Sequence, residues 1–95
     1  MEQRIPPIDL LEATHTFPGP FLFKAIGAHN KGFVARIVAA IREEMRYESD
    51  PPYELRETSS GRHVAVSVEL WVDSAERIRS IYERILKVEG LVLAL

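Results

Sequence analysis

The sequence has no cysteine among its 95 residues, and this absence removes two kinds of chemistry. Disulfide bridges and thiolate metal sites both need cysteine, so neither can stabilise the chain. A cysteine-free composition is compatible with a reducing compartment, and we expect a cytoplasmic location. Nothing in the sequence implies a cofactor or a bound metal.

Two further absences concern charge of one sign and long apolar runs. The net charge is −2 at pH 7, which gives no electrostatic reason to expect nucleic acid. No apolar run approaches the roughly 20 residues of a membrane span. The first seven residues also lack the apolar stretch of a signal peptide. We therefore expect no membrane association, and nucleic acid is a disfavoured partner.

Alternation of apolar and polar residues is the clearest pattern that is present, and it covers residues 63–72. A strand places alternate side chains on opposite faces, so this segment predicts a strand with one buried face. Residues 21–28 predict a second strand, with apolar residues on both faces. The buried set of the first segment is Val64, Val66, Val68, Leu70 and Val72, and it alternates with His63, Ala65, Ser67, Glu69 and Trp71.

Two segments change to the 3.6-residue period of a helix. The first runs from about residue 30 to residue 46, with Asn30 as its predicted N-cap. The second follows Asp73, which would cap the helix while Glu76 completes a capping box. Gly90 is expected to end that helix region in a left-handed conformation.

Residues 53–58 and 91–95 complete the pattern as shorter strands, and Ser59 to Arg62 is typical of a hairpin turn. The order of elements is then β, α, β, β, α, β. Right-handed crossovers place both helices on one face of a four-stranded antiparallel sheet of order 4132. The prediction is an α+β, ferredoxin-like domain over residues 17–95. Residues 1–16 are expected to form an N-terminal arm. Its first nine residues should be mobile or loosely docked, and Leu10 and Leu11 could pack a short turn onto the body.

A family resemblance adds to this expectation. Phe17-Pro18 followed by Phe21-Leu22-Phe23-Lys24-Ala25-Ile26-Gly27 is similar to the opening block of the bacterial YbeD-like proteins, the family called domain of unknown function 493. Ser59-Ser60-Gly61 with Val66-Ser67-Val68 resembles the second block, and Ile81-Tyr82 with the apolar last strand resembles the third. The resemblance implies a fold like that of ACT regulatory domains.

The match departs from the family pattern in the second block. The hairpin is one residue short after Ser60, His63 stands where an aromatic residue is usual, and Ala65 replaces a serine. Residues 13–16 also resemble an insertion before the first block. Any role tied to the hairpin tip is therefore open in this chain.

A search for catalytic groups finds no convincing constellation. His15, His29 and His63 have neither the spacing of metal ligands nor a suitable carboxylate beside them. Ser59 and Ser60 lie in a short turn, where no base is positioned to activate them and turn chemistry explains them better. We therefore expect a protein that is not an enzyme.

Two surfaces are left as candidate sites. The first is the sheet face that no helix covers, which should carry Leu22, Lys24 and Ile26 beside Ser67, Glu69 and Trp71. In the simpler interpretation Lys24 and Glu69 form a surface cross-strand pair. In the alternative interpretation this face binds a ligand, a protein partner or a second copy of the chain.

The second surface is the loop that leads into the first predicted helix. ACT domains place amino-acid effectors near the equivalent loop, so the resemblance implies a small-molecule site at Gly27, His29, Asn30 and Gly32. The alternative is an ordinary capped loop in which Gly27 serves the backbone.

These observations predict a small regulatory, ligand-sensing or protein-interaction module whose partner is an unknown protein or a small-molecule effector. A homodimer through the last strand or through the open face is a further prediction. A nucleic-acid-binding module is the alternative, although Trp71 is the only aromatic residue expected on the open face.

Overall fold

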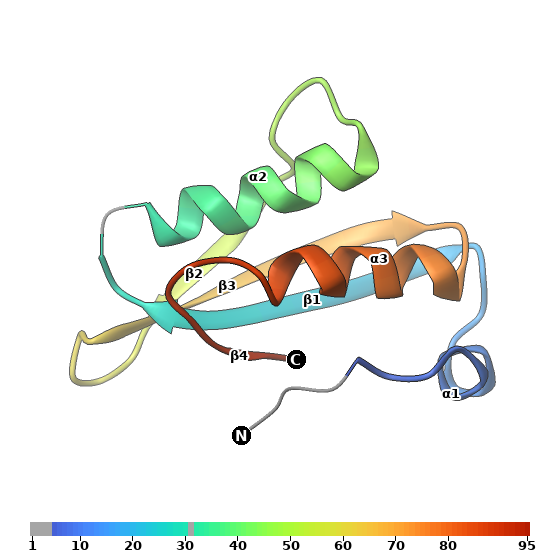
Figure 1. Ribbon diagram of the computed structural model, residues 1–95, viewed down its shortest axis with the longest axis horizontal. Coiled ribbons are helices and arrows are strands. Elements are labelled where there is room, and N and C mark those ends of the chain that lie inside the picture. The colour runs from blue at the N-terminus through green and yellow to red at the C-terminus, as the bar shows by residue number, and fades with distance from the viewer. Residues whose placement is uncertain (1–4, 31) are drawn as a thin grey trace.

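The computed structural model describes residues 5–30 and 32–95, and it contains the predicted elements in their predicted order with one helix added. In Figure 1, two helices lie side by side against the same face of a single sheet. The elements are α1 (Ile8–Thr14), β1 (Gly19–Ala28), α2 (Phe33–Met45), β2 (Glu54–Glu57), β3 (His63–Val72), α3 (Ala75–Ile85) and β4 (Leu91–Ala94).

The four strands form one antiparallel sheet in the order β2-β3-β1-β4. This is the predicted order 4132 seen from the other edge, and it confirms the α+β, ferredoxin-like architecture. The two central strands pair along their whole length, from Gly19 opposite Val72 to Ala28 opposite His63. β2 and β4 are short and lie at the edges, as expected from their weaker patterns.

The core lies between the sheet and the helices α2 and α3. One side of β3 contributes the predicted set of aliphatic residues, all of which are buried. From β1, Phe23 packs with its ring centroid 5.3 Å from that of Tyr82 on α3. The largest fully buried side chains are Phe23, Phe33, Ile37, Ile41, Ile78, Ile81, Ile85, Val64, Val66, Val68 and Val72.

Both helices begin later than the sequence pattern predicted. α2 starts after Gly32, whose φ of 95° is left-handed, so Asn30 is not the N-cap. The N-cap of α3 is Ser74 rather than Asp73, because the Ser74 hydroxyl accepts a hydrogen bond from the backbone N–H of Arg77 at 3.2 Å. The predicted capping box is therefore wrong, since Glu76 does not occupy the third helical position.

The N-terminal segment forms the helix α1 where a short turn packed by Leu10 and Leu11 was expected, and residues 1–4 of the predicted arm lie outside the described part of the chain. In α1, Leu11 is buried in the main core, while Ile5 and Ile8 pack against it. The Arg79 guanidinium on α3 also donates a hydrogen bond to the carbonyl oxygen of Pro6 at 2.7 Å. Apolar and polar contacts together hold this segment beside α3.

Candidate functional site

The strand register determines which residues lie beside one another on the open face. Across β1 and β3, Leu22 lies opposite Glu69, Lys24 opposite Ser67, and Ile26 opposite Ala65. From the edge strand β2, Glu54 lies opposite Ser67, and Arg56 lies opposite Ala65. The six residues predicted for this face are therefore together on two adjacent strands. Trp71 occupies the end of the array, opposite Pro20.

On this face, the central strands β1 and β3 each expose one large apolar side chain to solvent. Leu22 has 52% of its surface exposed and Trp71 has 65%, although both belong to the central strands of the sheet. The helices α2 and α3 lie on the other side of these strands and cannot cover them (Figure 1). Central strands normally gain stability from burial on both faces when a second layer is present. Here the open face keeps large apolar groups in contact with water.

The predicted pairing of Lys24 with Glu69 does not occur. Glu69 lies opposite Leu22 rather than Lys24, so the two charges are diagonal neighbours. Among the residues that the structure describes, neither side chain takes part in an ion pair. The simpler interpretation of this face as a neutralised cross-strand pair is therefore wrong.

A hollow of about 520 Å³ opens on this face beside Glu69. We call it the acidic hollow, because Glu54 and Glu69 are the only charged side chains that line it among the described residues. It is lined by Leu22, Pro52, Tyr53, Glu54, Ser67 and Glu69.

A second hollow, of about 530 Å³, adjoins the first, and we call it the Trp71 hollow. It lies between the loop that follows α2 and the end of β3, and it shares Pro52 and Glu69 with the acidic hollow. Its lining comprises residues 46–52 and 69–71.

Sequence analysis missed three lining residues, Pro52, Tyr53 and Glu54. They belong to the entry into the edge strand β2, and their place beside Glu69 depends on how β2 pairs with β3. The available signal was the alternation in β2, which puts Glu54 and Arg56 on one face. That signal did not reveal which β3 residues they would meet.

The loop of residues 27–32 shows structural roles for three of its four predicted site residues. A Cβ atom at Gly27 would come within 2.2 Å of the Phe33 ring, so glycine is needed for close packing there. His29 Nδ1 lies 3.0 Å from the carbonyl oxygen of Gly61, and its Nε2 lies 3.3 Å from a Glu57 carboxylate oxygen. Gly32 begins α2. These contacts explain the loop without a ligand, and its role as an effector site stays a prediction.

Asn30 and the other predicted histidines occupy separate places. The backbone N–H of Asn30 donates to the carbonyl oxygen of Ala28 at 2.9 Å. His15 stacks near Phe21, with ring centroids 4.9 Å apart, and His63 begins β3. Within residues 5–30 and 32–95, no group of histidine, aspartate and glutamate side chains is arranged to hold a metal ion.

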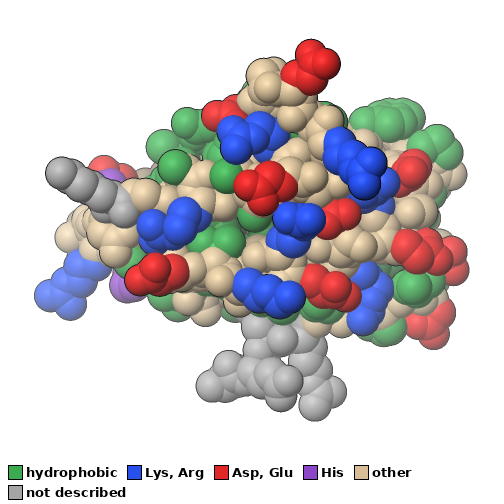
Figure 2. Space-filling model, turned by 45° about the horizontal axis from the view of Figure 1, so that its top comes forward, with side chains coloured by type: hydrophobic (Ala, Val, Ile, Leu, Met, Phe, Trp, Pro, Cys, Tyr) green, Lys and Arg blue, Asp and Glu red, His purple; other side chains and the backbone are tan. Residues whose placement is uncertain are grey.

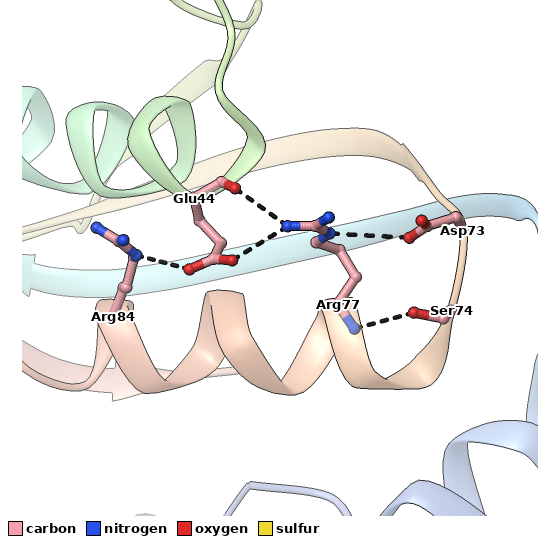
Figure 3. A network of polar contacts seen from close by, with 5 residues as sticks. All are labelled: Glu44, Asp73, Ser74, Arg77 and Arg84. Carbon is pink, nitrogen blue, oxygen red and sulfur yellow. Dashed lines mark hydrogen bonds and ion pairs between the residues drawn. The ribbon is translucent and has the colours of Figure 1, made fainter.

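The helical side of the molecule has a different polar chemistry. Figure 2 shows basic and acidic side chains interspersed over the side that carries the helices. Figure 3 shows that the Glu44 carboxylate of α2 lies between two arginines of α3. Its oxygens are 3.1 Å from Arg77 Nη1 and 2.7 Å from Arg84 Nε. Charges on this side therefore hold two helices together, unlike Glu54 and Glu69 on the open face.

None of the described helices is long and apolar enough to cross a membrane. This agrees with the composition, in which apolar residues recur periodically rather than in one long run.

Comparison with known proteins gives a family for this fold and surface. The family described as "Protein of unknown function (DUF493)" matches residues 12–95. The chain belongs to this family. The resemblance drawn from the first-strand motif is thereby confirmed, and the match begins inside α1.

Curated relatives carry names that describe no activity. A UPF0250 protein, PM1928 of Pasteurella multocida, is 26% identical over 87 residues, which cover 92% of each chain. A UPF0250 protein of Haemophilus ducreyi is 28% identical over 87 residues, covering 92% of this chain and 84% of the relative. The names of these relatives therefore state no function for the DUF493 family.

A solved structure supports the architecture. The solution structure of protein HP0495 from H. pylori matches with a TM-score of 0.63 and covers 98% of both chains. Its sequence identity is 18%, so this likeness concerns the fold alone.

Proposed function

We propose that this DUF493 protein is a non-enzymatic interaction module that binds another protein through the open face of its sheet. The observation that carries the proposal is the exposure of Leu22 and Trp71 on the central strands, on the face opposite the helices. Exposed apolar groups that cluster beside hollows are typical of binding surfaces.

A regulatory role is consistent with this proposal. The ACT-like resemblance of the sequence fits a module that senses or transmits a signal, although fold analogy alone is weak evidence of function. The open face is favoured over the 27–32 loop, because Gly27 and His29 already make packing and hydrogen-bond contacts within the chain. A protein partner is also favoured over nucleic acid, since Glu54 and Glu69 would repel phosphates.

Photo-crosslinking at matched leucines tests the proposal. Leu22 on β1 and Leu10 on α1 are both 52% exposed, so they offer a photoreactive replacement equal access to solvent. We expect the replacement at Leu22 to give discrete protein adducts in living bacteria, and the replacement at Leu10 to give few. Equal yields from the two positions, or no adducts from Leu22, would contradict the proposal.

A further inference from the structure

We infer that the partner segment carries a basic side chain, lysine or arginine, beside an apolar one, and that it docks in the acidic hollow. This inference rests on the proposed function and goes further by naming the chemistry of the partner. It follows from the lining of the hollow, its unpaired carboxylates and the aromatic residues beside it.

The two carboxylates of the acidic hollow have no ion-pair partner in the part of the chain that the structure describes. Glu54 and Glu69 take part in no ion pair among the described residues. Within residues 5–30 and 32–95, no lysine or arginine lines the hollow with them. Two carboxylates that share one hollow attract a cation more strongly than either does alone, because both lie within a few ångströms of the same space.

Apolar groups in the same hollow disfavour a small inorganic cation that keeps its hydration shell. Leu22 and Tyr53 expose 52% and 44% of their surfaces, and Pro52 completes the lining. A lysine or arginine side chain matches this mixture, because its methylene stem can pack on apolar surface while its charged end meets a carboxylate. An adjacent apolar residue of the partner would cover the remaining surface.

Trp71 lies on the neighbouring side of Glu69 and adds a face for a cation. Its side chain is 65% exposed, and its hollow shares Glu69 with the acidic hollow. A guanidinium or ammonium group is attracted to an exposed indole face. Arg46 also lines the Trp71 hollow, so the acidic hollow is the better position for the basic group itself.

The basic residues of the open face lie on the hairpin side of Glu69. Lys24 is level with Glu54, on the other side of Ser67, and Arg56 lies one step further toward the hairpin. Lys24 and Arg56 line a separate hollow of about 280 Å³, together with Glu54. By register, Arg56 lies opposite Ala65, and Trp71 lies six residues further along β3. The face is therefore acidic near Trp71 and more basic near the β2–β3 hairpin. A docked segment should place its basic residue at the Trp71 end.

Three short peptides test this inference in the intact protein. The probes are blocked at both ends and have the sequences Leu-Arg-Leu-Arg-Leu, Leu-Gln-Leu-Gln-Leu and Leu-Glu-Leu-Glu-Leu. Trp71 is the only tryptophan of the chain, so its fluorescence reports directly on this end of the face. We expect saturable changes with the arginine peptide, weaker ones with the glutamine peptide and none with the glutamate peptide. Added salt should weaken binding of the arginine peptide.

Matched charge variants locate the contact. Glu69→Gln should weaken binding of the arginine peptide by about two- to fivefold, and the Glu54→Gln/Glu69→Gln double variant by roughly tenfold. Glu76→Gln removes an exposed carboxylate on α3 and should leave binding unchanged. Lys24→Gln removes a nearby positive charge, so it should leave binding unchanged or strengthen it. Chemical shifts of the core amides check that each variant is folded.

The outcomes separate this inference from the proposed function. Equal binding of all three peptides would overturn the inference that the partner segment is basic. Equal weakening of arginine-peptide binding by the Glu69 and Glu76 variants would overturn it too. Adducts at Leu22 would still support the open face in that case. If no peptide binds while Leu22 gives adducts, the partner chemistry is wrong and the proposed function stands. An adduct of twice the chain mass with no peptide binding would point to a second copy instead.

Discussion

Leu22 and Phe23 are neighbours in β1 but face opposite sides of the sheet, and their environments differ sharply. Phe23 is 1% exposed and packs against Tyr82, whereas Leu22 is 52% exposed beside the acidic hollow. Burial of Phe23 explains why an aromatic residue is found there. The fold does not explain Leu22, because an exposed leucine gains little from folding. The open face therefore carries a large apolar side chain that the packing of this chain does not cover.

The charged residues of the two sides differ in the same way. On the helical side, Glu44 is paired with two arginines and its side chain is only 18% exposed. On the open face, Glu54 and Glu69 are exposed, and neither belongs to any of the ion pairs formed within the described chain. One side uses charge to join its helices, while the carboxylates of the other form no ion pair among the described residues.

The largest predicted contrast comes from alanine substitutions at the two neighbours. Phe23→Ala should cost about 3–5 kcal/mol of unfolding free energy, because it removes a buried ring and leaves a cavity. Leu22→Ala should change stability by less than about 0.5 kcal/mol. Urea unfolding of both variants measures the difference. If the alanine variant does not fold, Phe23→Leu takes its place, with an expected loss of roughly 1–2 kcal/mol of unfolding free energy. Similar losses for Leu22 and Phe23 would contradict the distinction between the faces.

A pair of glycines gives the next contrast. Gly27→Ala should destabilise the protein by about 1–3 kcal/mol, because its Cβ would overlap the Phe33 ring. At Gly61 a Cβ meets nothing within 4 Å, and only the positive φ of 73° opposes it. Gly61→Ala should therefore cost about 1 kcal/mol. Thermal unfolding compares the two variants. A Gly27 variant as stable as the parent would remove the packing explanation for this loop.

A smaller effect on stability is expected at Glu44, whose carboxylate joins α2 to α3. Glu44→Gln should cost roughly 1–2 kcal/mol, since it weakens two charge-assisted hydrogen bonds in a partly buried position. Glu43, which is exposed and contacts Arg84 alone at 3.4 Å, is the matched control. Its change to Gln should cost less than about 0.5 kcal/mol. Chemical denaturation at low and high salt distinguishes the two, and equal effects would mean that the network adds nothing to stability.

Tyr82 predicts the smallest effect, and only at alkaline pH. Burial raises the pKa of the Tyr82 phenol above its ordinary value of 10.0, so the folded state holds this proton more tightly than the unfolded chain does. The stabilisation that comes from this difference in pKa is present below the pKa of the unfolded chain and is lost as pH rises above it. Tyr82→Phe should make the unfolding free energy less sensitive to pH above about 10, where the unfolded chain loses this proton before the folded state does. An unchanged pH dependence in this variant would count against the burial effect.

Much of the fold could be predicted because local patterns agreed with the final packing. The alternation along β3 and the apolar stripes of α2 and α3 each select one buried face, and all three faces meet in the core. The helix starts were harder to predict. Asp73 and Ser74 are both good caps, and only the hydrogen bond from Arg77 distinguishes them. The N-terminal helix was predicted only as a short turn packed by Leu10 and Leu11, because its docking depends on a few long-range contacts such as that of Leu11.

The candidate site was predicted only in part, for a related reason. Alternation correctly placed Leu22, Glu69 and Trp71 on the open face, since it depends on one strand at a time. The failed pairing of Lys24 with Glu69 and the missed role of Tyr53 both depend on register between strands. A strand pattern fixes which side a residue faces, but the neighbour across the sheet follows from pairing that involves distant residues.

The most direct test of the open face as the binding surface is hydroxyl-radical footprinting of Leu22 and Leu10 in living bacteria and in the purified protein. The two leucines are equally exposed in the isolated chain, so their oxidation rates in the purified protein should be similar. We predict that oxidation of Leu22 falls several-fold relative to Leu10 in cells, as a partner covers it. An unchanged ratio of the two rates between cells and purified protein would contradict the account.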